Sequence, residues 1–231
     1  MLTHSAKPIL FTACLLLPAC ATAALLNAQK PALRTAAQIG LSDVTKFNAI
    51  VRLHDAKSGQ FFCTGVVISR FVIATAGHCL EGRNPLDPDI EVRPMSGQPT
   101  KIYAGLASQG ADVRADQGAL VGDFQAFNSI HAVTDFESNI SAVSTGKHLV
   151  TCGYPLSAKL LCTPFVYRSF YNFHFIGAGM LWGGQSGGPV IDLETGNVVG
   201  TNFASADTEI LVNTLGGFWE VMGIPELLQK P

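Results

Sequence analysis

A glycine-rich stretch surrounds a single serine, and a second stretch far upstream carries a histidine beside a cysteine. The first reads GGQSGGPV and places Ser186 among four glycines. The second reads VIATAGHC and ends an apolar run at His78. A serine hydroxyl is a poor nucleophile until a nearby base takes its proton, and an imidazole oriented by a carboxylate is the usual partner. Together the two stretches indicate nucleophilic catalysis by an activated serine.

The order of these residues along the chain restricts the folds that could bring them together. Residues 184–188 match the GxSxG pattern, whose glycines leave the turn open around the hydroxyl and let backbone N–H groups face an oxyanion. Taken alone this pattern is weak, because a glycine-rich loop between strands looks similar. An α/β-hydrolase needs its histidine after the nucleophile. No histidine follows Ser186, which excludes that fold.

The elements that must position these side chains are predicted to be strands. Short apolar runs rich in Val, Ile and Phe follow one another between residues 49 and 203, and glycine or proline separates most of them. Turn signals such as Thr195-Gly196-Asn197 lie in the gaps. This pattern is typical of an all-β sandwich or barrel. Only the end differs, because Phe218–Gln229 has mixed helical spacing and predicts a short, interrupted helix.

Composition narrows the class of protein and its partners. The chain has 231 residues, of which 48% are hydrophobic and 14% charged, as expected of a globular protein. Its net charge of -2 and the absence of a basic run argue against a nucleic-acid partner. The remaining histidines are isolated, with no second ligand at metal spacing. Nothing in the sequence requires a metal or an organic cofactor.

The first 46 residues predict export. Residues 1–23 have a Lys, an apolar stretch and small residues ending at Ala23, which fits a secretory signal peptide rather than a membrane span. A second processing site is open at Leu17-Pro18-Ala19-Cys20, which resembles a bacterial lipoprotein cleavage box and would attach a lipid to Cys20. Residues 24–46 are interpreted as a propeptide or an N-terminal arm. We therefore expect a secreted or periplasmic protein.

The two stretches together resemble the signatures of trypsin-like (chymotrypsin-fold) serine peptidases. VIATAGHC is similar to their Thr-Ala-Ala-His-Cys segment, and GGQSGGPV to their Gly-Asp-Ser-Gly-Gly-Pro segment. The resemblance covers about residues 47–203 and is closest in character to secreted bacterial members. It implies two six-stranded antiparallel β-barrels over residues 47–231, with a boundary near residues 125–145 and the active site between them. The implied protein is an endopeptidase acting on polypeptides, and we expect it to be a monomer.

The same resemblance implies the roles of the site residues. Ser186 would attack the peptide carbonyl, His78 would move the proton, and the N–H groups of Gly184 and Ser186 would bind the oxyanion. The orienting aspartate is open among three candidates. Asp116 fits best, because a small residue and an apolar run follow it, whereas Asp123 and Asp112 remain alternatives.

The cysteines outside the leader favour disulfides over zinc, because their spacing lacks CxxC pairs and export places them in an oxidising compartment. Four cysteines allow three pairings. The resemblance implies a Cys63–Cys79 bridge beside the histidine, and we expect Cys152 to pair with Cys162.

The chain departs from the family pattern at two positions beside the proposed chemistry. Gln185 replaces an aspartate that pairs with a newly cleaved N-terminus in trypsin-like enzymes, so that route of activation is not expected. Gly77 replaces an alanine, which adds backbone freedom costing about 0.5 to 1 kcal/mol unless the position needs glycine.

The resemblance places Met180 near the base of the specificity pocket, with Asn202 and Phe203 in its wall. No carboxylate lies at these positions, so a medium or large uncharged side chain is expected on the acyl side of the scissile bond. The competing hypothesis is a catalytically inactive homologue that acts as a binding protein.

Overall fold

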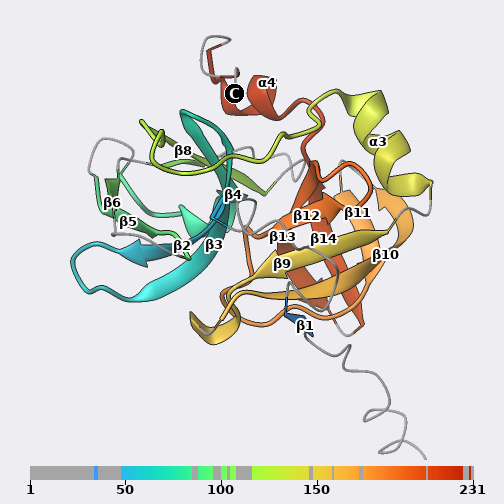
Figure 1. Ribbon diagram of the computed structural model, residues 1–231, viewed down its shortest axis with the longest axis horizontal. Coiled ribbons are helices and arrows are strands. Elements are labelled where there is room, and N and C mark those ends of the chain that lie inside the picture. Colours follow the sequence, from blue (N-terminus) through green and yellow to red (C-terminus); the bar gives the residue numbers. More distant parts are fainter. Residues whose placement is uncertain are drawn as a thin grey trace, which may run out of the picture. The chain divides into compact units, whose positions relative to one another are not determined.

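The described part of the computed structural model is mostly β-structure. It comprises residues 34–35, 48–84, 88–95, 100–102, 105–107, 116–145, 148–157, 159–171, 174–206, 208–225 and 229. Two antiparallel sheets account for most of these residues (Figure 1). The all-β prediction is therefore confirmed.

The first sheet carries the segment that ends at His78. Its strand order is β6-β5-β2-β3-β4-β8-β7. The bounds are β2 (Ile50–Asp55), β3 (Phe61–Ser69), β4 (Val72–Ala76), β5 (Ile90–Arg93), β6 (Thr100–Ile102), β7 (Gly105–Ala107) and β8 (Gln117–Val121). All five residues of β4 are buried, because this strand lies inside the sheet between β3 and β8. A 3₁₀ turn, η2 (Gly77–Cys79), follows β4 directly and carries His78 to the surface.

The second sheet closes into a barrel. Its six strands are β9 (Leu149–Gly153), β10 (Leu161–Tyr171), β11 (His174–Ala178), β12 (Pro189–Asp192), β13 (Val198–Ala206) and β14 (Glu209–Thr214). Strand β9 pairs with both β12 and β10, which completes the ring. A short β1 (Arg34–Thr35) pairs with the start of β10. The predicted pair of closed barrels is thus confirmed for this sheet only, because no pairing among the described strands joins β6 to β7.

Helices are few and short. Helix α3 (Phe136–Ser144) follows the first sheet, and the side chain of Asp135 caps it by accepting from Ser138 N at 2.8 Å. A 3₁₀ turn, η3 (Pro155–Ser157), follows β9. Helix α4 covers Phe218–Met222, which is the first part of the short, interrupted helix predicted over Phe218–Gln229. It stops there because Gly223 adopts φ +62° as a left-handed cap, and residues 226–228 lie outside the description.

Side chains on the two sheets meet in a shared core. Tyr154, which follows β9, is 2% exposed and donates its hydroxyl to the Ile50 carbonyl of β2 at 2.9 Å. Burial raises the pKa of this phenol to about 12.

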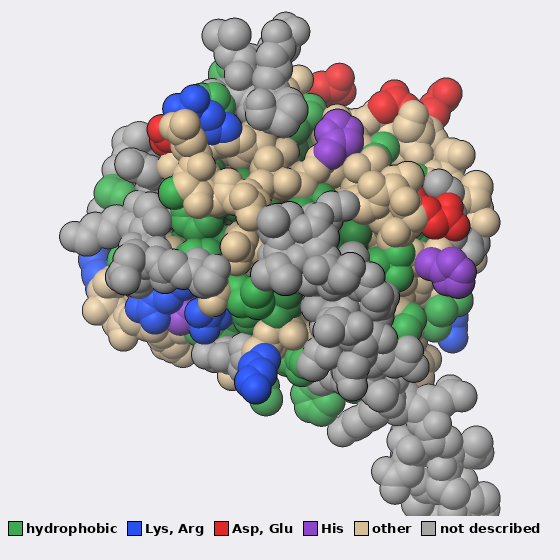
Figure 2. Space-filling model, in the orientation of Figure 1, with side chains coloured by type: hydrophobic (Ala, Val, Ile, Leu, Met, Phe, Trp, Pro, Cys, Tyr) green, Lys and Arg blue, Asp and Glu red, His purple; other side chains and the backbone are tan. Residues whose placement is uncertain are grey.

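Within the described residues, no helix is long and apolar enough to span a membrane. On the face shown in Figure 2, basic side chains lie mostly over the first sheet and acidic ones mostly near α3.

The structure contains both expected disulfides. Cys63 in β3 is bonded to Cys79 in η2, which ties the turn that carries His78 to a central strand. Cys152 and Cys162 are bonded across β9 and β10, where they are direct pairing partners.

We expect the double substitution Cys63→Ser/Cys79→Ser to lower the free energy of unfolding by about 3 kcal/mol, because the bridge closes a loop in the unfolded chain. Urea unfolding of the two proteins, both kept oxidised, measures the difference. The matched control is Cys152→Ser/Cys162→Ser, which should cost a similar amount. A midpoint unchanged in the first variant would contradict the expectation.

Candidate active site

The structure brings His78 and Asp116 together by two hydrogen bonds. Asp116 lies just before β8, which is the neighbour of β4 in the first sheet. Its Oδ2 lies 2.6 Å from His78 Nδ1, and its Oδ1 accepts from the His78 backbone N–H at 2.7 Å. The carboxylate therefore fixes both the ring and the backbone of the histidine. Of the other candidates, Asp123 is paired with exposed Arg70 at 3.4 Å, and Asp112 lies outside the described residues.

Gly77 leaves room for this contact. A Cβ at this position would lie 2.7 Å from Asp116 Oδ1 and 2.8 Å from the Gln117 carbonyl oxygen, closer than real Cβ atoms approach. The Gly77 N–H also donates to the Asp116 carbonyl at 2.8 Å. The departure from alanine is therefore in keeping with close packing, because a Cβ here would force Asp116 or the start of β8 to shift.

Electrostatics favour the protonated form of His78. The hydrogen bond to Asp116 raises the pKa of the imidazole, burial opposes that shift, and the charges of Asp116 and Glu81 add to it. The ring is still 40% exposed, and the Asp116 side chain 27%. Because the shift is upward, its contribution to stability is present at low pH and is lost as the pH rises through the folded-state pKa.

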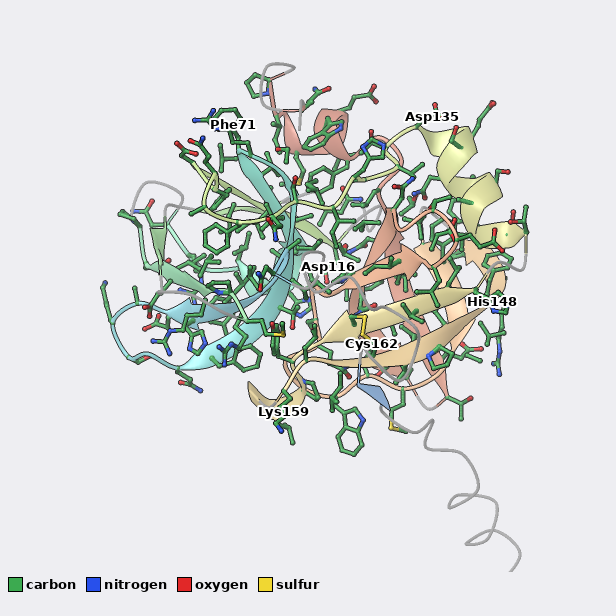
Figure 3. The ribbon with its side chains drawn as sticks, viewed as in Figure 1. Phe71, Asp116, Asp135, His148, Lys159 and Cys162 are labelled. Carbon is green, nitrogen blue, oxygen red and sulfur yellow. A yellow bond between two sulfur atoms is a disulfide. The ribbon has the colours of Figure 1, made fainter. Side chains whose placement is uncertain are left out.

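A contact that sequence reasoning missed comes from the second sheet. The Asn213 side chain of β14 accepts from Asp116 N–H at 3.1 Å and donates to the Asp116 carbonyl at 2.6 Å. Asn213 is fully buried. These bonds join residues 97 positions apart, so no local sequence pattern could predict them. Figure 3 shows Asp116 where strands of the two sheets meet.

The turn around Ser186 is compact and depends on glycine at defined positions. Gly184 and Gly187 have φ of +92° and +80°, a region that other residues rarely adopt. A Cβ on Gly187 would lie 2.0 Å from Thr75 Oγ1, and one on Gly188 would lie 2.0 Å from the Cys152 carbonyl oxygen. The glycines therefore allow the turn to pack directly against both sheets.

Thr64 of β3 connects this turn to the first sheet. Its backbone N–H donates to the Ser186 carbonyl at 2.9 Å, and its hydroxyl donates to the Gly184 carbonyl at 2.6 Å. A Cβ on Gly187 would also lie 3.0 Å from the nitrogen of Ala76, two residues before His78. The turn thus packs beside the end of β4. Among the described residues no hydrogen bond joins Ser186 Oγ to His78.

Gln185 holds the turn through an uncharged amide. Its Oε1 accepts from Trp182 N–H at 2.8 Å, while its own N–H donates to the Trp182 carbonyl at 3.0 Å. The side chain is fully buried. Neither Gly184 N–H nor Ser186 N–H donates to another group in the described part of the chain. Two backbone donors of the turn are therefore available to an anion.

The three residues assigned to the specificity pocket have different surroundings. Asn202 is fully buried, and its amide accepts from the Thr151 hydroxyl and donates to the Gln185 carbonyl. Phe203 is half-buried with its ring centroid 4.7 Å from that of His174, and Met180 is half-buried. An open cleft of about 370 Å³ lies beside Gly184 instead, lined by Gln60, Phe61, Phe62, Leu156, Gly183 and Gly184.

One group of potential metal ligands lies at the site. Atoms of Cys63, His78 and Cys79 lie within 4.8 Å of one another. Both cysteines are engaged in their disulfide, so neither offers a thiolate, and this donor set does not fit a metal ion.

One protein-family model matches part of the chain. The trypsin family model matches residues 41–115, a segment that contains His78 and stops just before Asp116. The resemblance to trypsin-like serine peptidases is confirmed. The match spans less than half of the chain and leaves the Ser186 turn outside it. No curated protein shows significant sequence similarity to the chain.

Solved structures of trypsin-like proteases share the fold. The active form of the Rv3671c protease from M. tuberculosis is 22% identical, with a TM-score of 0.61, covering 86% of this chain and 90% of its own. The VesB protease of Vibrio cholerae is 14% identical, with a TM-score of 0.64, covering 83% and 65%. An inactivated protease paralogue from the scabies mite is 15% identical, with a TM-score of 0.61, covering 78% and 94%. The trypsin match supports a serine peptidase, and these neighbours show that the chain has the fold of trypsin-like proteases.

We expect Asp116→Asn to lower the pKa of His78, because the substitution removes the largest cause of its upward shift and leaves the burial that opposes it. An NMR titration of the His78 ring protons measures the change. The matched control is Glu81→Gln, which removes only a weaker charge contribution and should shift the pKa less. An unchanged His78 pKa in Asp116→Asn would contradict the geometry described above.

Proposed function

We propose that the protein is an exported serine endopeptidase in which Ser186, His78 and Asp116 form the catalytic triad. The observation that carries this proposal is the double contact of the Asp116 carboxylate with the Nδ1 and backbone nitrogen of His78. A carboxylate at Nδ1 selects the tautomer that leaves Nε2 free to accept a proton. The turn carrying Ser186 packs beside the end of β4, next to that histidine.

The reaction follows from these roles. Ser186 Oγ attacks the carbonyl carbon of the scissile bond while His78 Nε2 takes the hydroxyl proton. The tetrahedral intermediate collapses as His78 gives that proton to the leaving amine, and an acyl-enzyme remains. Water then attacks the acyl-enzyme ester while His78 takes its proton, and His78 returns that proton to Ser186 Oγ as the acid product leaves. These steps require a hydrogen bond between Oγ and Nε2, and catalytic hydrogen bonds commonly tighten only in the substrate complex.

The N–H groups of Gly184 and Ser186 would bind the oxyanion. Each such donor typically contributes about 3 kcal/mol of transition-state stabilisation. The unused donors in the turn support this role. Their direction is held by the reciprocal bonds of Gln185 with Trp182, which need no ammonium group.

The substrate is a polypeptide, with an uncharged or apolar side chain preferred on the acyl side. No carboxylate accompanies Met180, Asn202 and Phe203, so a basic side chain would lack a counter-charge. The Asn202 amide already binds Thr151 and the Gln185 carbonyl, which leaves it unavailable to an acidic substrate. Two disulfides are in keeping with an exported enzyme. The signal peptide, the 24–46 arm and a lipid at Cys20 concern residues almost wholly outside the described part.

We expect the wild-type protein to be labelled by a fluorophosphonate probe and Ser186→Ala to remain unlabelled, because only an activated serine reacts with this electrophile. Gel fluorescence with intact-mass analysis reads out the adduct. Heat-unfolded wild type is the control for nonspecific reaction. A folded wild type that takes up no label would favour the inactive binding homologue over the peptidase.

We expect hydrolysis of a panel of chromogenic peptides to be fastest after an uncharged or apolar residue. Peptides that differ only in that residue, compared by kcat/KM, provide the measurement. Fastest cleavage after Arg or Lys would refute the proposed pocket.

A further inference from the structure

We propose that Asn213 is a positioning residue that fixes Asp116, and through it the His78 ring, relative to the nucleophile turn. The inference rests on the proposed function and adds to it a residue of the second sheet that touches no reacting atom.

Asn213 satisfies both backbone groups of Asp116. Its Oδ1 accepts the Asp116 N–H at 3.1 Å, and its Nδ2 donates to the Asp116 carbonyl at 2.6 Å. An amide is suited to this task because one face offers both a donor and an acceptor. Asn213 itself is fully buried, so water cannot replace these bonds at its side chain without opening the contact between the sheets.

The next residue of β14 strengthens the same contact. Gln117 Nε2 donates to the Thr214 carbonyl at 2.5 Å, directly after the Asn213–Asp116 pair on both strands. Two consecutive residues of the second sheet therefore hold Asp116, just before β8, and Gln117, the first residue of β8. The backbone of Asp116 is held by the second sheet, while its carboxylate binds His78 in η2, next to the first sheet.

Asn213 is also linked to the nucleophile turn through the sheet. It pairs with Thr201 of β13, and the next residue, Asn202, exchanges backbone hydrogen bonds with Gly187 and Gly188 at 2.7 and 2.8 Å. A continuous path of paired backbone thus runs from the residue beside Ser186 to Asn213, and from its side chain to Asp116. This path makes the acid and the nucleophile parts of one rigid arrangement, although they lie on different sheets.

Asn213→Ala and Asn213→Thr provide the test, because alanine loses both bonds and threonine keeps one hydroxyl that can serve either backbone group. We expect Asn213→Ala to reduce kcat on a peptide ester by about 10- to 100-fold with little change in KM, since small misplacements of catalytic groups have effects of this size. We also expect a lower His78 pKa by NMR titration. Asn213→Thr should fall between alanine and wild type in both measurements.

The matched control is Asn139→Ala. Asn139 is an equally buried amide that binds the Val133 and Val199 carbonyls at 2.9 and 2.7 Å and the Thr214 hydroxyl, without touching Asp116. This variant should lose stability but keep kcat within about twofold of wild type at a temperature where both are folded. Wild-type kcat and His78 pKa in Asn213→Ala, or an equal loss of kcat in Asn139→Ala, would overturn the proposal.

The pKa measurement separates this inference from the proposed function. If the wild type neither hydrolyses peptides nor reacts with a fluorophosphonate, the peptidase proposal fails, yet the His78 pKa still reports whether Asn213 positions Asp116. If Asn213→Ala does not fold, the same two measurements are made on Asn213→Thr. A His78 pKa and a kcat equal to those of the wild type in Asn213→Thr would then contradict the proposal.

Discussion

The contact between the Asp116 carboxylate and His78 is the interaction on which the rest of the site depends. One carboxylate serves the ring nitrogen and the backbone nitrogen of the same residue, so the imidazole cannot rotate without losing a charged hydrogen bond. Two neighbouring features support this contact. Gly77 leaves room for the carboxylate, and the Cys63–Cys79 bridge ties η2 to β3.

The second constraint is that His78 follows β4 of the first sheet, whereas the turn that carries Ser186 precedes β12 of the second sheet. Packing of apolar residues brings the sheets together, but apolar packing is not directional and does not set their register. Buried hydrogen bonds between the sheets supply that direction. Thr64 binds the carbonyls of Gly184 and Ser186, and Asn213 binds the backbone of Asp116. Each bond is costly to break, because a buried partner would be left unsatisfied.

Three buried amide side chains form hydrogen bonds around the Ser186 turn and Asp116. Gln185 closes the turn that carries the two unused N–H donors, Asn202 binds its far side, and Asn213 reaches across to Asp116. An uncharged amide suits a buried position because it offers a donor and an acceptor without the desolvation cost of an ion. The chain therefore supports its site with neutral groups where a buried carboxylate would need a counter-ion.

The sequence by itself determined the strand-rich fold, the stretches around His78 and Ser186, and the favoured aspartate, because alternating apolar runs and short motifs are local properties. It did not identify Gly223 as the end of α4, and it offered no reason for Gly77. Only the tertiary structure decided which distant residues meet. It shows that Asp116 binds His78, that the Asn202 amide binds the Gln185 carbonyl, and that the Asn213 amide binds the backbone of Asp116. Those contacts join residues 17 to 97 positions apart, and such pairings are fixed by how the two sheets pack.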